Sequence, residues 1–203
     1  MALSLDVWSD YVCPFCYLEE PVLAKMQKEF GNQLAVHWRA FELRPEPLPT
    51  LPPRGDYLGD MWERAVYPMA RERGMNLKLP LVQPRSRLAL EAAECAREHR
   101  RFEAMHAAIF RAFFEEGRDI GQEEVLLDLA ESCGLERRAL ERALTSGQYR
   151  PAVLKDEALA GELGLSAVPA MLLRKDDESL SGAQHLTGAQ PEAILRFSIR
   201  QLL

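Results

Sequence analysis

Two cysteines separated by two residues are the most chemically reactive feature of this sequence. They form the motif Cys13-Pro14-Phe15-Cys16 close to the N-terminus. A CxxC pair has three interpretations: half of a zinc site, a redox-active dithiol, or a chance spacing.

The zinc interpretation needs more ligands than the sequence offers. A structural zinc site uses about four ligands, commonly a second CxxC or a pair of histidines. Cys95 and Cys133 do not form a second CxxC, and His99 and His106 are not closely spaced. We therefore expect no metal. Four cysteines in 203 residues also do not make a disulfide scaffold.

The redox interpretation is favoured by the position of the motif. Residues 3–9 alternate apolar and polar side chains, which predicts a short strand. A helix is predicted from the CxxC to Gly31-Asn32, and residues 34–41 predict a second strand. The motif therefore lies between the first strand and the helix of a βαβ unit, as it does in thioredoxin-like redox proteins.

This position gives the two cysteines different roles. The attacking species in disulfide exchange is a thiolate, and the N-terminus of a helix stabilises negative charge. Cys13 is therefore the candidate nucleophile. Cys16 lies one turn later, where it can attack a mixed disulfide and release the substrate. Phe15 is expected to be exposed between them, where an aromatic ring suits contact with a peptide.

The remaining chain separates strands at both ends from helices in the middle. Residues 45–53 hold five prolines and predict an extended connector. Strands are predicted at 167–173 and within 179–187, and a last helix near Gln190-Pro191. Helical spacing is found at 57–73, 86–99, 101–116, 122–133, 136–145 and 151–163. We expect an α/β domain made of residues 1–55 and 151–203, interrupted by an inserted helical domain at 56–150.

Composition excludes several classes of protein. The net charge of −6 argues against nucleic acid as a partner, because phosphate binding needs a basic face. No run of 18 apolar residues is present, so we expect no membrane span. Residues 1–10 lack the basic and apolar regions of a secretory signal, which predicts a cytoplasmic protein.

Four motifs occur in order along the chain. They are Ser9-Asp10-Tyr11-Val12-Cys13-Pro14-Phe15-Cys16-Tyr17, Trp38-Arg39-Ala40-Phe41-Glu42-Leu43-Arg44-Pro45, Gly164-Leu165-Ser166-Ala167-Val168-Pro169 and Gly188-Ala189-Gln190-Pro191. Together they resemble the FrnE-like branch of the DsbA family over nearly the whole chain. The resemblance implies a thioredoxin-like fold with a large inserted all-helical domain and a dithiol–disulfide oxidoreductase activity.

The resemblance also implies roles for residues far from the CxxC. Pro169 would follow a cis peptide bond and face the cysteines, and Val168 would pack nearest to the active sulfurs. The backbone of this segment would bind an extended substrate as an added strand. Relatives often carry Pro-Trp or Pro-His where Pro14-Phe15 stands, so we do not expect a strong oxidant.

Other reactive side chains have simpler interpretations. Cys95 and Cys133 lie on apolar helical faces and are expected to be buried core residues. Asp10 and Glu42 are candidate acids that could help to move the proton of Cys16. Each of these two carboxylates is more often a solvated charge.

We therefore expect exchange between the Cys13/Cys16 pair and disulfides of proteins or small molecules. A reducing cytoplasm favours reductase or isomerase roles. No bound cofactor is expected. Partners would be thiol- or disulfide-containing proteins or peptides, with glutathione as a co-substrate or thioredoxin as an electron partner, and the protein would be a monomer or homodimer.

Two alternatives remain open. The first is a glutathione-dependent isomerase or transferase of the 2-hydroxychromene-2-carboxylate isomerase or kappa type, whose members typically carry serine at the position of Cys13. The second is a non-enzymatic, peptide-binding holdase.

Overall fold

The computed structural model describes residues 2–203. Within them the chain forms two compact units. The first unit combines the residues up to Phe41 with Asp156–Leu203, and the second is Glu42–Lys155. The first unit is therefore discontinuous in sequence, and the second is continuous.

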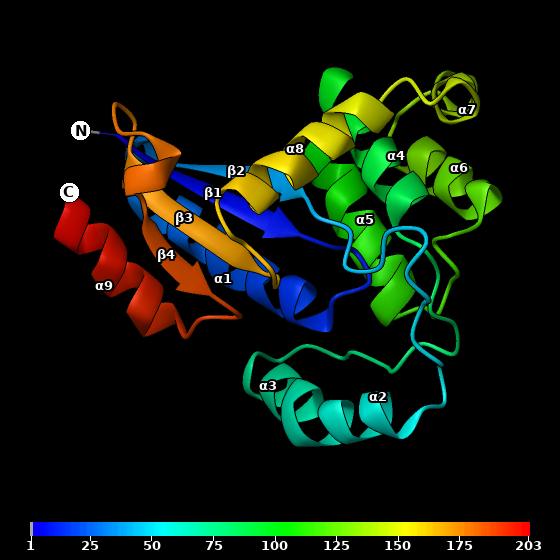
Figure 1. Cartoon of the computed structure of the whole chain (residues 1–203), viewed down its shortest axis with the longest axis horizontal. Helices are drawn as coiled ribbons and strands as arrows, with labels where there is room; N and C mark the ends of the chain where they lie inside the picture. Colours follow the sequence, from blue (N-terminus) through cyan, green and yellow to red (C-terminus); the bar gives the residue numbers. More distant parts are fainter. Residues whose placement is uncertain (1) are drawn as a thin grey trace. The chain divides into compact units, whose positions relative to one another are not determined.

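A four-stranded sheet forms the centre of the first unit (Figure 1). Its strands are β1 (Leu3–Ser9), β2 (Leu34–Ala40), β3 (Ala170–Lys175) and β4 (Gln184–Thr187), in the order β2-β1-β3-β4. β1 pairs parallel with β2 and antiparallel with β3, and β3 pairs antiparallel with β4. The two ends of the chain therefore build one sheet, as the sequence predicts.

One face of this sheet carries an apolar core. Alternate residues of a strand point to the same face, and Leu3, Leu5 and Val7 of β1 pack there with Met171 and Leu173 of β3. Helices α1 (Pro14–Phe30) and α9 (Glu192–Leu202) contribute their apolar sides to the same cluster. The helix that begins at the CxxC is thus fixed directly against the sheet.

The intervening residues of β1 are also buried, including the polar ones. Ser4 donates a hydrogen bond to Asp176 at 2.6 Å, and Asp6 pairs with Arg39 at 2.6 Å. The indole of Trp8 donates to the carbonyl oxygen of Asp156 at 2.9 Å. The alternation of polar and apolar residues therefore marks two covered faces rather than one covered and one solvated face.

The second unit is helical, and its helices follow the predicted segments closely. Their bounds are α2 (Asp56–Met61), a π-helical turn (Trp62–Val66), α3 (Tyr67–Glu72), α4 (Arg87–Glu98), α5 (Phe102–Phe114), α6 (Glu123–Ser132) and α7 (Arg137–Ser146). Helix α8 (Arg150–Glu162) begins in this unit and ends in the first. No helix within residues 2–203 is long and apolar enough to cross a membrane.

A buried histidine lies in the aromatic core of this unit. The ring of His106 stacks on Phe102 at 5.1 Å and meets Phe110 edge-on at 5.0 Å. Burial lowers the pKa of His106 to about 3, and the positive charge of Arg97 acts in the same direction. The side chain is therefore neutral at ordinary pH.

Two local predictions are wrong. Strand β3 begins at Ala170 rather than at residue 167, because the preceding residues form a bend that ends in Pro169, which has no N–H to give to a sheet. Cys133 is half-buried rather than a core residue. It caps the end of α6, and Leu129 and Leu135 fill the buried positions on either side.

Candidate active site

Cys13 occupies the N-cap of α1. Its backbone is extended, its carbonyl oxygen accepts the N–H of Cys16 at 3.1 Å, and Pro14 begins the helix. Proline suits this first position because its fixed φ is helical and the missing N–H would have no partner in the helix. No side-chain oxygen caps the helix. A thiolate on Cys13 would therefore lie where an N-cap side chain normally accepts hydrogen bonds from the backbone N–H groups of the first helical turn.

Cys16 is completely buried one turn into the helix. Burial raises the pKa of the Cys16 thiol well above its ordinary value, and the hydrogen bond and charge of Cys13 act in the same direction. Contacts with the backbone of Asp10 and the side chain of Ser9 oppose this rise but do not cancel it. Both cysteines are free thiols that lie within hydrogen-bonding reach of each other.

Val168 lies beside the first of these thiols. The Cys13 Sγ donates to the Val168 carbonyl oxygen at 3.5 Å, across 155 residues of sequence. The Val168–Pro169 peptide bond is cis, and the Val168 side chain is buried. The fold therefore brings together residues from the first and last fifths of the chain.

The two residues between the cysteines differ in exposure. Pro14 is buried, and Phe15 is partly exposed. Phe15 is thus the side chain of the motif that is most open to solvent, in the position where we expect contact with a peptide.

Asp10 is not the solvated charge that the sequence suggested. It is completely buried. Its carbonyl oxygen accepts the N–H of Cys13 at 3.1 Å, and its Oδ1 accepts the N–H of Val12 at 3.3 Å. Asp10 therefore shapes the turn that leads from β1 into α1 and presents Cys13.

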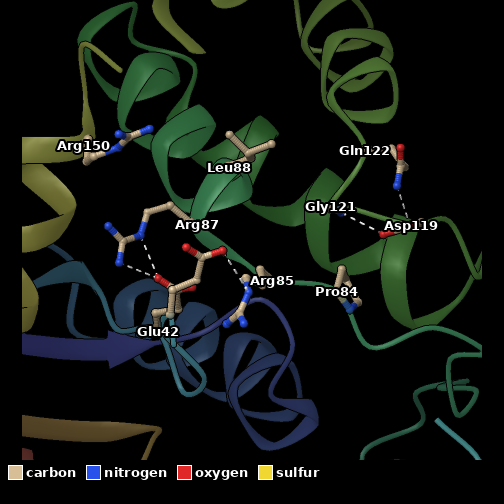
Figure 2. Close-up of a pocket in the computed structure, with 10 residues that line it drawn as sticks. Glu42, Pro84, Arg85, Arg87, Leu88, Asp119, Gly121, Gln122 and Arg150 are labelled. Carbon is tan, nitrogen blue, oxygen red and sulfur yellow. Dashed lines mark hydrogen bonds and ion pairs between the residues drawn. The ribbon is translucent and has the colours of Figure 1, made fainter. Parts of the chain in front are cut away.

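Glu42 also differs from the solvated charge that we expected. It belongs to the second unit, is 5% exposed, and accepts two hydrogen bonds from Arg87 at 2.6 and 2.7 Å. The pair lines a cavity of about 660 Å³ together with Arg85, Leu88 and Arg150 (Figure 2). Glu42 is thus a buried carboxylate paired with Arg87 within the helical unit.

Within residues 2–203 no group of three or more His, Cys, Asp and Glu side chains could hold a metal ion. The groups gathered at the candidate site are two thiols, a carbonyl oxygen and the N-terminus of a helix.

Comparisons with known proteins identify the family to which this fold belongs. The model of the DSBA-like thioredoxin domain matches residues 4–192. The chain belongs to this family. Among curated proteins it is 34% identical to YwbO, an uncharacterized protein of Bacillus subtilis, over 179 residues that make up 85% of this chain and 88% of that protein.

Solved structures share the fold of this DSBA-like protein. One is SCO1869 of Streptomyces coelicolor, described as a probable DsbA oxidoreductase, with 25% identity, a TM-score of 0.79, and coverage of 98% of this chain and 89% of that chain. Another is a 2-hydroxychromene-2-carboxylate isomerase, with 20% identity, a TM-score of 0.78, and coverage of 98% and 95%. Because both carry the same fold, the choice between oxidoreductase and isomerase depends on the residues at the site.

Sequence reasoning missed one acid of this DSBA-like site. Glu19 lies three residues after Cys16 and is completely buried. Its Oε2 accepts the backbone N–H of Gln190 at 2.9 Å. The available signal was a charged residue on an otherwise apolar side of the predicted helix.

Proposed function

We propose that this protein is a dithiol–disulfide oxidoreductase that acts through Cys13 and Cys16. The observation that carries the proposal is the position of Cys13, at an uncapped helix N-terminus and 3.5 Å from the Val168 carbonyl oxygen. The fold is shared with an isomerase, but a pair of free thiols at this helix start supports exchange chemistry.

The reaction proceeds in two transfers. The Cys13 thiolate attacks one sulfur of a substrate disulfide, a Cys13–substrate disulfide forms, and the released substrate thiolate takes up a proton. Cys16 then loses its proton and attacks the Cys13 sulfur, which releases the second substrate thiol and leaves a Cys13–Cys16 disulfide. Two electrons pass from the protein to the substrate, and a dithiol or two molecules of glutathione restore the reduced pair.

The raised pKa of Cys16 supports this order of events. A buried thiol that stays protonated does not compete with Cys13 for the substrate. Its proton must leave before the second step. Asp10 is the candidate acceptor, because its backbone contacts the Cys16 sulfur and its carboxylate is buried in the same turn.

The substrate would be an extended peptide or a small disulfide. Val168 and Pro169 would bind its backbone as an added strand, and Phe15 would contact its side chains. In a cytoplasmic setting the pair would rest largely reduced, so the favoured direction is reduction or isomerisation with glutathione or thioredoxin as electron source.

Reduction of insulin by dithiothreitol tests the proposal. Wild type should accelerate the reaction, Cys13→Ser should abolish the acceleration, and Cys133→Ser should leave it intact because that half-buried thiol lies in the helical unit. Equal turnover by Cys13→Ser and wild type would overturn the mechanism. Isomerase activity with glutathione that survives loss of both thiols would favour the isomerase. Suppression of aggregation by the double variant, without exchange by wild type, would favour a holdase.

A further inference from the structure

Glu19 is a buried carboxylate in an unexpected place. It shares one side of α1 with Cys16, Leu23, Met26 and Phe30, at the spacing of three and four residues that places side chains over one another on a helix. The other members of this stripe are a thiol and apolar side chains. Burying a carboxylate is costly unless it is hydrogen-bonded, so a leucine would pack this surface at lower cost. The hydrogen-bond partner of Glu19 therefore indicates what this carboxylate does in the fold.

That partner is a backbone group from the far end of the chain. Glu19 Oε2 accepts the N–H of Gln190, 171 residues away. The Gln190 side chain in turn donates to the carbonyl oxygens of Thr187 at 2.7 Å and Gly188 at 3.3 Å. Residues 188–190, which we call the 188–190 loop, are thus tied to α1 and folded onto the end of β4.

The same loop supports the segment that contacts Cys13. The N–H of Gly188 donates to the Pro169 carbonyl oxygen at 2.8 Å. Pro169 follows Val168, whose carbonyl oxygen accepts the Cys13 thiol. Helix α1 therefore meets the Val168–Pro169 segment twice, once through Cys13 and once through Glu19 and the 188–190 loop.

We propose that Glu19 is a positioning residue. It keeps the Val168–Pro169 segment aligned with Cys13, so that peptide substrates can bind beside the thiol. Glu19 acts through the 188–190 loop and not on the reacting sulfurs. The inference rests on the proposed exchange function, because it assigns the segment to substrate binding. It adds a residue on the active-site helix whose task is to align the two halves of the site.

Three variants separate this role from general stability. Glu19→Ala removes the acceptor, and Glu19→Gln keeps a side-chain oxygen that can accept from Gln190. Glu29→Ala is the matched control, because Glu29 also joins α1 to the C-terminal segment, through Arg196 at 2.8 Å, but at the opposite end of the helix.

Amide hydrogen exchange measures directly how firmly Glu19 holds the 188–190 loop. In Glu19→Ala the Gly188 amide should exchange at least tenfold faster than in wild type, while amides within β3 are unchanged. Glu19→Gln should restore the Gly188 rate to within threefold of wild type, and Glu29→Ala should not alter it. An unchanged Gly188 rate in Glu19→Ala would overturn the proposal.

Kinetics with two substrates tests the consequence for the site. For a disulfide-linked peptide, Glu19→Ala should lower kcat/KM about tenfold, chiefly through KM, and Glu19→Gln should recover most of the loss. For 5,5′-dithiobis(2-nitrobenzoate), a small disulfide without a peptide backbone, the change should stay below twofold. Equal losses with both substrates would contradict a role in positioning peptides.

The two readouts distinguish failure of this inference from failure of the proposed function. If wild type shows no thiol–disulfide exchange with either substrate, the proposed function is refuted. Amide hydrogen exchange would still measure the contact between Glu19 and the 188–190 loop. If Glu19→Ala does not fold, Gln190→Pro replaces it, because proline lacks the backbone N–H that Glu19 accepts. An unchanged Gly188 rate in Gln190→Pro would then overturn the proposal.

Discussion

The thiol of Cys13 donates to the carbonyl oxygen of Val168, and this contact distinguishes it from the other thiol of the motif. Cys13 lies at the helix N-terminus beside a backbone group that a substrate would also use. Cys16 lies one turn deeper and is completely buried. The two thiols therefore differ in position and surroundings, and the proposed function gives them separate tasks.

Replacing each cysteine in turn should reveal this division. Cys16→Ala should still react with a peptide disulfide but should stop at the Cys13–substrate disulfide, because no resolving thiol is left. Cys13→Ala should form no adduct. Intact-mass spectrometry after mixing would measure the adduct, and a comparable yield from both variants would contradict the assignment.

The buried Cys16 thiol should make the reduced protein sensitive to alkali. Its pKa is raised in the folded state, whereas an unfolded cysteine ionises near pH ~8.5. The protonated Cys16 thiol therefore makes its full contribution to the free energy of unfolding below that pH. This contribution is lost as the pH rises toward the folded-state pKa, at about 1.4 kcal/mol per pH unit.

Urea denaturation of the reduced protein from pH 7 to 10 would measure this loss. The Cys16→Ala variant should lose less stability over the same range, because its only relevant difference is the missing thiol. Parallel curves for wild type and variant would contradict the prediction.

His106 should make the protein sensitive to acid. Its pKa is about 3 in the folded protein and about 6.5 in an unfolded chain, so only the unfolded state binds the proton between these values. The contribution of His106 to the free energy of unfolding is fully present above pH ~6.5. It is lost as the pH falls below this value, by about 1.4 kcal/mol per pH unit.

The variant His106→Phe keeps a ring between Phe102 and Phe110 and removes the titration. Its stability should fall less steeply than that of wild type between pH 6.5 and 4, while the two slopes agree above pH 7.5. Equal slopes in the acid range would show that His106 does not control this loss.

Replacing either of two glycines that have open surroundings by alanine should change the stability of the protein, in opposite directions. Gly188 has a φ of +78°, and a Cβ there would meet no atom within 4 Å, so only the backbone conformation opposes the change. We expect Gly188→Ala to destabilise the protein by about 1–2 kcal/mol. Gly161 lies in α8 with equally open space, and Gly161→Ala should stabilise by about 0.4–1 kcal/mol. Chemical denaturation of both variants measures the difference, and a shift of the same sign in both would contradict the argument.

The spacing of apolar residues, together with the glycines and prolines that end segments, predicts most of the helices and strands. The helix that starts at Pro14 ends at Phe30, directly before Gly31, and the segment predicted at 101–116 is α5. These predictions succeed because spacing of apolar residues and helix-ending glycines are local signals. The pairing of the two chain ends also follows from the order of the predicted strands.

The burial of the acids could not be predicted in the same way. Asp10 and Glu19 are completely buried, and one carboxylate oxygen of each accepts a backbone N–H, from Val12 and from Gln190 respectively. Glu42 is buried because Arg87 accompanies it. The partners of Glu19 and Glu42 lie 171 and 45 residues away, so no local pattern predicts them. Val12 is only two residues from Asp10, but the charge of Asp10 alone suggests a solvated side chain.

The ribosome makes Cys13 long before it makes Val168. Synthesis proceeds from the N-terminus at about 5–20 residues per second. Since 155 residues separate Cys13 from Val168, the thiol emerges roughly 8–30 s before its carbonyl partner. During that interval β3 does not yet exist, so β1 has β2 as its only partner in the sheet. If the proposed function holds, a nascent chain carries both thiols before the groups that would bind a substrate beside them, and the site is complete only once Val168 and Pro169 have been translated.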